Sequence, residues 1–439
     1  MPQARRLDGT GPTRRDFVRG ASGVLLAAGA AAGGDEATPE PVRVAVIGTG
    51  ARGCDLIRSL TTIPGADLVA VCDDYPPHLQ EGARYAGPGA RAFDDLRRLL
   101  DAAKPRAVVI AVPLPLHHRM AVAALEAGCD VFCEKTMCFR LDEAADLARR
   151  VTEAQRVFQV GLQRRANAVY QQAAALVRAG ALGQVSAITC QWHRNHNWRR
   201  PVPVPRTDPK WPALERRLNW RLYRASSAGL MAELGSHQLD VATWVLGATP
   251  RRVVASGGID YWRDGRDVPD TIVCIYDYEL PTPPSAPGAK SGSPAPYTVR
   301  VTYSSLCNNA YEGASELILG TRGSLFLTPT QGLLYREQGP DDAVWTRSAP
   351  DDAAVLTAGK TLKLSNAPWA RRGEPIAIEN VQGDDTRDQL VSFLDHVRRR
   401  DVRTLCDVAE GLRNTATVLM ANQALDSGQA VDYPAVDRS

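Results

Sequence analysis

Short, continuously apolar runs alternate with amphipathic segments between residues 42 and 160. Such runs, rich in Val, Ile and Ala, are typical of strands buried on both faces of a parallel sheet. The segments between them carry apolar residues at helical spacing, as in 117–128 and 141–155. This alternation predicts a doubly wound α/β domain. The expected strands are 42–47, 68–72, 107–112, 130–133 and 157–160.

The rest of the chain mixes strand-like and helix-like segments. A helix is expected at 230–246, and two more helices close the chain at 384–399 and 407–425. A stretch rich in Pro, Gly and Ser, 281–296, predicts a mobile surface loop. Residues 329–383 are too weakly patterned to assign. The strand-like segments are 252–256, 271–278, 297–304 and 316–319.

The first forty residues have the pattern of an export signal. The arginine pair Arg14-Arg15 is followed by an apolar stretch of small residues, 21–34, which is typical of a twin-arginine signal. That stretch is too short for a stable membrane anchor, which needs about 20 apolar residues. We therefore expect an exported, periplasmic or otherwise extracytoplasmic protein. The expected parts are a signal and linker at 1–40, a first domain at 41–163 and a second at 164–439.

Composition narrows the class of protein. The chain has 439 residues, 44% hydrophobic and 23% charged, as in ordinary globular proteins of about two domains. Residues 1–32 hold five Arg and two acidic residues, so the remainder carries no net charge. A neutral body lacks the basic footprint of a nucleic-acid-binding protein. The nine Cys indicate small core residues rather than a disulfide framework.

The turn after the first expected strand reads Gly-Thr-Gly-Ala-Arg-Gly at 48–53. Gly48 permits a tight turn, Gly50 lets the backbone approach a pyrophosphate, and Gly53 lets the helix pack close to the strand. The helix N-terminus then offers unpaired N–H groups to the phosphates. Asp73 ends the second strand, where an acid accepts hydrogen bonds from the adenosine ribose and repels a 2′-phosphate. These residues predict NAD, in preference to NADP, as the cofactor.

Later landmarks follow in a recognisable order, at 116–117, 124–128, 133–135, 161–165 and 233–240. With them, the chain resembles the glucose–fructose oxidoreductase and inositol dehydrogenase family (Gfo/Idh/MocA). The resemblance implies an N-terminal Rossmann domain and a C-terminal α/β domain whose open, mainly antiparallel sheet holds the substrate. It also implies a set of cofactor-binding residues, namely Gly48, Gly50, Ala51, Arg52, Gly53, Asp73, His117, Glu134 and Lys135.

Hydride transfer from a sugar alcohol needs a base for the hydroxyl proton and a donor for the developing alkoxide. Lys135 follows an expected strand and can supply the donor. Glu233, His237 and Asp240 share one face of the helix at 230–246. Spacing alone favours the solvated stripe of an amphipathic helix. The resemblance instead implies His237 as general base, Glu233 as its orienting or proton-relay partner, and Asp240 as support.

Two residues depart from the family pattern. Thr136 follows Lys135 where the family usually has proline, and Glu233 stands where the family often has aspartate. Both departures bear on the chemistry of the site and not on the fold.

Substrate contacts are expected from 191–200 and 219–224. The first segment reads QWHRNHNWRR. Its Trp rings can stack on a sugar, and its Asn, His and Arg side chains can bind hydroxyls; a charged surface loop with buried Trp anchors explains the segment equally well. Two His three apart in a strand point to opposite faces, so no metal is assigned. The expected substrate contacts are Arg165, Trp192, His193, Trp198 and Asp240.

The favoured function is an NAD-dependent oxidoreductase with tightly bound cofactor, acting on a hydroxyl of a sugar, polyol or glycoside. The same residues would serve an NAD-dependent glycoside hydrolase that works by oxidation, elimination, hydration and reduction, as some relatives do. A non-catalytic sugar-binding protein of the same fold is a third hypothesis. An open sheet with one exposed face also predicts a homodimer or homotetramer.

Overall fold

The computed structural model describes residues 40–282, 295–337, 376–378 and 383–436. From residue 41 onward the described residues belong to one compact unit with two sheets, one parallel and one mainly antiparallel. The twin-arginine segment, most of the Pro-rich stretch and most of the unassigned region 329–383 lie outside the described residues. The predictions made for them therefore stay predictions.

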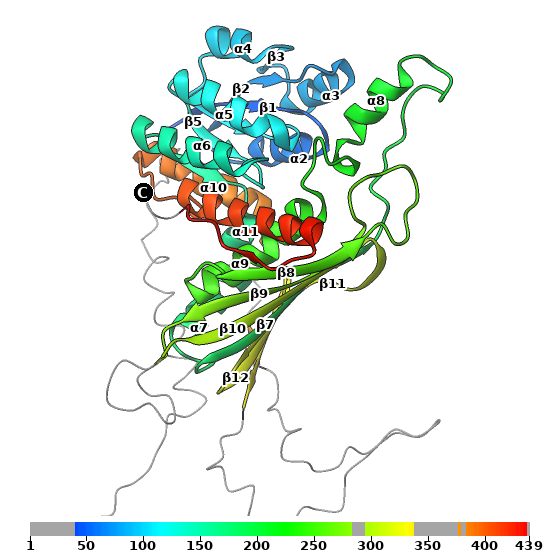
Figure 1. The fold of residues 1–439 in the computed structure, drawn as a ribbon. Helices are drawn as coiled ribbons and strands as arrows, with labels where there is room; N and C mark the ends of the chain where they lie inside the picture. The colour runs from blue at the N-terminus through cyan, green and yellow to red at the C-terminus, as the bar shows by residue number, and fades with distance from the viewer. Residues whose placement is uncertain (1–39, 283–294, 338–375, 379–382, 437–439) are drawn as a thin grey trace, which may run out of the picture. The chain divides into compact units, whose positions relative to one another are not determined.

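The first sheet has six parallel strands in the order β3-β2-β1-β4-β5-β6 (Figure 1). The order reverses between β1 and β4, and in such sheets ligands bind beyond the strand ends at this point. The strands are β1 (Val42–Ile47), β2 (Ala66–Cys72), β3 (Arg91–Phe93), β4 (Ala107–Ile110), β5 (Asp130–Cys133) and β6 (Phe158–Val160). The helices between them are α2 (Ala51–Leu60), α3 (Pro76–Ala86), α4 (Leu96–Ala103), α5 (His117–Glu126) and α6 (Leu141–Ala154).

Two features of this layer escape the sequence pattern. The edge strand β3 is three residues long and buries only Phe93, so it leaves no apolar run to detect. Helix α10 (Asp385–Arg399) returns from the far end of the chain and packs on α2 and β1. Its Phe393 lies edge-on to Phe132, with ring centroids 5.8 Å apart. The domain boundary after residue 163 stays a prediction, and α10 shows that later residues also complete this core.

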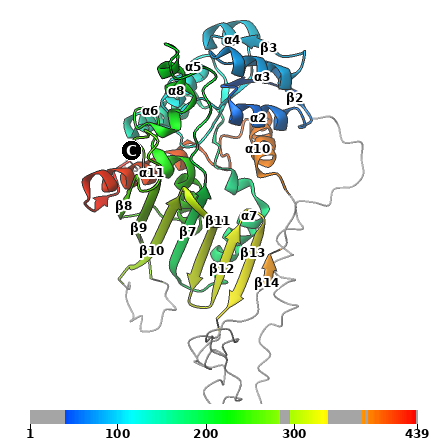
Figure 2. The same ribbon diagram turned by 90° about the vertical axis from the view of Figure 1, so that its right-hand side faces the viewer.

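The second sheet has nine strands in the order β14-β13-β12-β11-β7-β10-β9-β8-β15. Only β7 and β10 pair in parallel. Helices α7 (Ala168–Arg178), α9 (Ser236–Leu246) and α11 (Val408–Ser427) gather on one side of it (Figures 1 and 2). The strands are β7 (Val185–Asn195), β8 (Arg252–Gly258), β9 (Thr271–Leu280), β10 (Tyr297–Leu306), β11 (Asn308–Gly320), β12 (Gly323–Thr328), β13 (Gln331–Arg336), β14 (Ile376–Ile378) and β15 (Val431–Asp432).

The segment that leads into α9 begins with a π-helical turn, Met231–Gly235. Nine of the 11 residues of α9 are buried, because the helix lies between α11 and the second sheet. The interpretation of its polar face as a solvated stripe, which spacing alone favours, is therefore wrong. The polar residues that it carries are held inside the protein, where each needs a partner or a function.

The nine cysteines all lie in the described part of the chain, and each is buried and free. They fill the core as the sequence predicts. No helix among the described residues combines the length and the apolar character that a bilayer crossing requires.

Candidate active site

The turn from β1 into α2 is shaped by its glycines. Gly48 has φ +87°, and a Cβ there would lie 2.6 Å from the Ala111 carbonyl oxygen. A Cβ on Gly53 would lie 1.9 Å from the Gly48 carbonyl oxygen, so strand and helix touch through bare backbone. A Cβ on Gly50 would meet nothing closer than the His78 ring at 3.7 Å. The missing side chain of Gly50 therefore leaves the start of α2 open.

The N-terminus of α2 has the character of an anion site. Gly50 occupies the N-cap and supplies no side-chain cap, and the first turn contains no acidic residue. Its first N–H groups have no partner within the helix, and they carry partial positive charge. A pyrophosphate group satisfies both conditions, so the residues present fit a dinucleotide.

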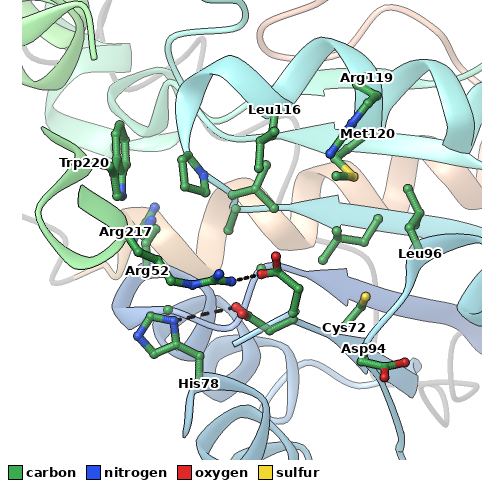
Figure 3. Close-up of a pocket in the computed structure, with 18 of the residues that line it drawn as sticks. Arg52, Cys72, His78, Asp94, Leu96, Leu116, Arg119, Met120, Arg217 and Trp220 are labelled. Carbon is green, nitrogen blue, oxygen red and sulfur yellow. Dashed lines mark hydrogen bonds and ion pairs between the residues drawn. The ribbon is translucent and has the colours of Figure 1, made fainter. Parts of the chain in front are cut away.

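Asp73 stands at the end of β2, beside this turn. Its two carboxylate oxygens accept hydrogen bonds from the Thr49 N–H at 2.8 Å and the Tyr75 N–H at 2.9 Å. The His78 ring reaches toward the same carboxylate, at 3.8 Å (Figure 3). Backbone and ring thus fix the acid at the edge of the groove, where a ribose hydroxyl can donate to it.

The groove beyond the strand ends has a volume of about 680 Å³. Leu96, Leu116 and Met120 form an apolar wall, and Arg217 and Trp220 lie across from it (Figure 3). Arg217 comes from helix α8 (Trp211–Leu218), which follows β7. This helix is not predicted from the sequence. Arg217 forms an ion pair with Asp74, next to Asp73. Helix α8 is thereby fastened across the groove.

A second cavity, of about 580 Å³, lies beside this groove. The two share lining residues such as Ala51, Arg52 and Trp220, so they are adjacent. The second cavity is lined by nine of the residues that the sequence singles out, from both predicted domains: Ala51, Arg52, His117, Glu134, Lys135, Trp192, Trp198, Glu233 and His237.

Lys135 lies just beyond the end of β5, and its side chain is 13% exposed. Its Nζ donates to the carbonyl oxygens of Ala232 at 3.3 Å and Glu233 at 3.0 Å. Burial lowers the pKa of Lys135, and the carboxylate of Glu233 opposes that shift. The peptide bond between Lys135 and Thr136 is cis. Lys135 follows a strand of the first sheet, and its ammonium is thus held by backbone oxygens of the π turn that leads into α9.

Glu233 lies in the π turn, and its side chain is 12% exposed. Its Oε2 accepts a hydrogen bond from the Arg221 Nε at 2.9 Å and lies 3.9 Å from the Lys135 Nζ. Burial acts to raise the pKa of Glu233, but the charges of Arg221 and Lys135 prevail and hold it below its ordinary value. The structure pairs Glu233 with these two cations and not with His237. The family resemblance implies the pairing with His237, whereas spacing alone only places the two residues on one helix face, and such α-helical spacing does not hold across a π turn.

His237 lies in the first turn of α9 and is buried. Its ring lies against Trp192, with centroids 5.4 Å apart, and its Nδ1 has no hydrogen-bond partner among the described residues. Burial, and then the charge of Lys135, lower the pKa of His237 well below its ordinary value. The lowered pKa favours the neutral ring, which is the form that can accept a proton.

Glu134 and His117 brace the floor of the cavity. Glu134 accepts from the Arg52 Nε at 2.7 Å. The two ring nitrogens of His117 lie 3.0 Å from the carbonyl oxygens of Val112 and Thr136. The contacts of His117 join the loop after β4 to the loop that carries Lys135. Glu134 and His117 therefore help to position Lys135.

Three expected substrate contacts lie elsewhere. Arg165 and Asp240 form a buried ion pair, with Nη2 to Oδ1 at 2.8 Å, and Arg165 also binds Glu410 of α11 at 2.8 Å. His193 binds the Ser304 hydroxyl at 2.9 Å. None of the three lines the cavity, because their polar atoms are already satisfied within the protein. Among the described residues, no group of three or more His, Cys, Asp or Glu is placed to hold a metal ion.

Two family models match the chain. One, described as the oxidoreductase family with an NAD-binding Rossmann fold, matches residues 42–162, and the other, the GFO/IDH/MocA C-terminal domain, matches residues 170–282. Together they span more than half of the chain. The chain belongs to the GFO/IDH/MocA family. The expected family, the Rossmann domain and its NAD cofactor are thereby confirmed.

Two curated relatives illustrate this family. Inositol 2-dehydrogenase of Mycolicibacterium smegmatis is 36% identical over 155 residues, which are 35% of this chain and 45% of that protein. D-Glucoside 3-dehydrogenase of Escherichia coli is 29% identical over 215 residues, 48% of this chain and 55% of that protein. The chain spans about half the length of the curated relatives it matches.

Solved structures share the fold of this GFO/IDH/MocA member. Levoglucosan dehydrogenase, in complex with NADH and levoglucosan, is 17% identical with a TM-score of 0.64, covering 90% of this chain and 100% of that one. The WlbA dehydrogenase of Bordetella pertussis, in complex with NADH and UDP-GlcNAcA, is 20% identical with a TM-score of 0.62, covering 90% and 99%. The predicted pairing of a parallel sheet with a mainly antiparallel one is confirmed.

Several residues of this GFO/IDH/MocA site are not singled out by sequence reasoning. Arg194, Arg200 and Arg221 line the cavity with Trp220. All four fall within the two segments from which substrate contacts are expected. In the sequence alone, however, arginines in such segments are equally typical of a surface loop. Only the fold shows which of them turn inward.

Proposed function

We propose that this chain is an NAD-dependent dehydrogenase that moves a hydride between the nicotinamide and a carbon bearing a hydroxyl in a sugar, polyol or glycoside. The observation that carries this proposal is that two spaces lie side by side. The groove at the N-terminus of α2 adjoins the cavity that Lys135 and His237 line from different parts of the fold. When bound, the nicotinamide supplies or accepts the hydride.

The side chains divide the remaining work. The neutral ring of His237 accepts the proton of the reacting hydroxyl as the carbon loses its hydride. The ammonium of Lys135 donates to the same oxygen while negative charge develops on it. The carboxylate of Glu233 supports the charged form of Lys135, and Arg221 fixes that carboxylate. The indoles of Trp192, Trp198 and Trp220 offer flat surfaces to a sugar ring.

The comparisons support the substrate class. The two relatives are named for inositol and for D-glucosides, and one solved structure contains levoglucosan. All are compounds with hydroxyls on a ring, and the cavity joins apolar indole surfaces to polar side chains in the way that such compounds need.

The test is a panel of hexoses, polyols and methyl glycosides, supplied with NAD⁺ and followed by NADH absorbance. We expect turnover of some panel members, and Lys135→Ala and His237→Ala should each lower kcat by about 100-fold or more. His118→Gln is the matched control, because His118 pairs with Asp146 outside the cavity. Turnover that survives both site variants would refute the assignment. Aryl glycosides that release their aglycone without net NADH would instead indicate the hydrolase.

We also propose export by the twin-arginine route. The support is the Arg14-Arg15 pair and the apolar stretch at 21–34. A reporter fused behind residues 1–40 should leave the cytoplasm of a bacterium with an intact twin-arginine system, and Arg14→Lys/Arg15→Lys should block it. Export of the double variant would refute this route.

A homodimer is the final part of the proposal. Val254, Val273 and Ile275 lie on the outer face of β8 and β9 and are each more than 40% exposed. Such a patch favours burial against another protein surface, and a second copy of the same sheet offers a matching one. Light scattering after size exclusion should give a multiple of 47.5 kDa; a monomer at all protein concentrations would contradict it.

A further inference from the structure

The cavity around Lys135 and His237 is lined by more cations than acids. Six basic residues face three carboxylates, which belong to Asp55, Glu134 and Glu233. The six are Arg52, Lys135, Arg194, Arg199, Arg200 and Arg221. Sugars and polyols are neutral, so this excess has no role in the reaction as described so far.

Most of these cations are neutralised by protein carboxylates. Arg52 pairs with Glu134, and Arg221 and Lys135 share Glu233. Arg199 pairs with Glu215 and Asp264, which lie outside the lining. Within the described chain, this leaves Arg194 and Arg200 without a carboxylate partner.

Arg200 and Arg194 differ in position. Arg200 lines both the groove and the cavity, so it faces the groove in which we expect the phosphates of the dinucleotide. Arg194 lines the cavity and not the groove. The cofactor's phosphates therefore do not account for Arg194.

Arg194 is held in place by aromatic rings. Its guanidinium carbon lies 4.8 Å from the ring centroid of Trp192 and 5.4 Å from that of Trp198. It is half-buried, and burial lowers its pKa; the carboxylate of Glu233 opposes that shift only in part and forms no ion pair with Arg194 in the described chain. A guanidinium stacked in this way is pre-organised to bind a carboxylate or phosphate through two N–H groups.

The same indole also contacts the proposed base. The Trp192 ring lies against His237 as well as under Arg194. One aromatic ring thus separates the group that takes the hydroxyl proton from the unpaired guanidinium.

We propose that Arg194 determines specificity by binding an anionic group on the substrate, so that the enzyme oxidises sugar acids, or sugar phosphates, which are also anionic, in preference to neutral sugars. The inference rests on the proposed function, because it names the substrate class of that site. The hydride still passes to NAD⁺ and the hydroxyl proton to His237. The anionic group is bound but does not react.

The experiment compares matched pairs of compounds on the full chain with NAD⁺ present: D-glucuronate and D-galacturonate with the corresponding hexoses, and glucose 6-phosphate with glucose. We expect the unmodified chain to favour the anionic member of a pair by at least about tenfold in kcat/KM. Arg194→Gln should abolish that preference, chiefly through KM, because a hydrogen bond to a charged group contributes about 1.5–3 kcal/mol, or about 10- to 100-fold. Arg194→Lys should keep part of it, because the charge remains while the planar fork is lost.

Arg206→Gln is the matched control, because Arg206 also stacks on an indole, that of Trp211, but lies outside both spaces. It should leave the preference unchanged. An unmodified chain with no preference for either anion would overturn the inference. So would an Arg194→Gln variant that keeps the preference, or one whose main defect is a weaker Kd for NADH.

Calorimetric titration of the same sugars into the chain saturated with NADH separates this inference from the proposed function. Arg194-dependent binding of an anion without any turnover supports the inference and refutes the dehydrogenase. Turnover of neutral sugars with no anion binding refutes the inference and leaves the dehydrogenase intact. The uronates and the phosphate together show which anion is recognised.

Discussion

Replacing Gly50 with alanine separates cofactor binding from folding. The backbone at Gly50 has φ −63° and ψ −174°, which any residue adopts. The added Cβ has ordinary contact distances to the His78 ring, so the protein has room for it. A small gain from stiffening the unfolded chain offsets a small loss at the N-cap. We expect the free energy of unfolding to change by less than about 1 kcal/mol.

The effect on the cofactor should be much larger. The new methyl group stands where a pyrophosphate must approach the first N–H groups of α2. A hydrogen bond to a charged group contributes about 1.5–3 kcal/mol, and 1.4 kcal/mol is a factor of ten in affinity. The loss of one such bond should raise the Kd for NADH by about 10- to 100-fold.

Calorimetric titration with NADH measures that Kd, and a thermal melt of the same sample checks the fold. Gly89→Ala is the matched control, because Gly89 is exposed, lies outside the groove and has nothing within 4 Å of an added Cβ. A folded Gly50→Ala variant that binds NADH as tightly as the unmodified chain would refute the placement of the pyrophosphate.

Three further predictions follow from the charges of the site and its surroundings. Arg217→Gln removes the ion pair with Asp74 that fastens α8 across the groove. Because exposed ion pairs contribute up to about 1 kcal/mol, stopped-flow measurements should show NADH leaving up to about fivefold faster, and an unchanged rate would deny α8 a role in retention. Burial raises the pKa of Glu316, which accepts from the Tyr170 hydroxyl, from 4.5 to about 7. The unfolded chain therefore ionises first, and stability falls as the pH rises from 4.5 through 7. Glu316→Gln should raise the melting temperature, relative to the unmodified chain, more above pH 7 than below pH 4.5, and equal shifts at both would contradict this. Since the pKa of His237 lies well below 6.5, kcat/KM for oxidation should stay constant as the pH falls through 6.5 and decline only in stronger acid; an acid limb centred at or above 6.5 would contradict a buried neutral base.

The local pattern was sufficient for much of the first layer. The strands with continuous apolar runs and the glycine turn at 48–53 appear where the sequence predicts them. The edge strand β3 could not be predicted, because two of its three side chains face solvent. Helix α10 belongs to the first core through contacts with α2 and β1, which lie more than 300 residues away in the chain. No local pattern records a contact of that kind.

In the candidate site, too, the local sequence predicts some residues, whereas contacts between distant parts of the chain escape it. Lys135, His237 and Trp192 could be singled out by residue type and position, and they line one cavity. The ion-pair partners of the neighbouring acidic residues could not be predicted from the sequence. Asp240 is taken up by Arg165, which is in turn bound by Glu410 from α11. The π turn before α9 redirects Glu233 toward Arg221 and Lys135. Each of these pairings depends on elements that meet only in the folded chain.

A crystal structure of the full chain with NADH is the most direct test of the whole account. We expect the pyrophosphate on the N–H groups at the start of α2, a ribose hydroxyl on Asp73, and the nicotinamide ring in the cavity with its reactive face toward Lys135 and His237. A nicotinamide that lies outside this cavity, or that turns its reactive face away from both side chains, would contradict the account.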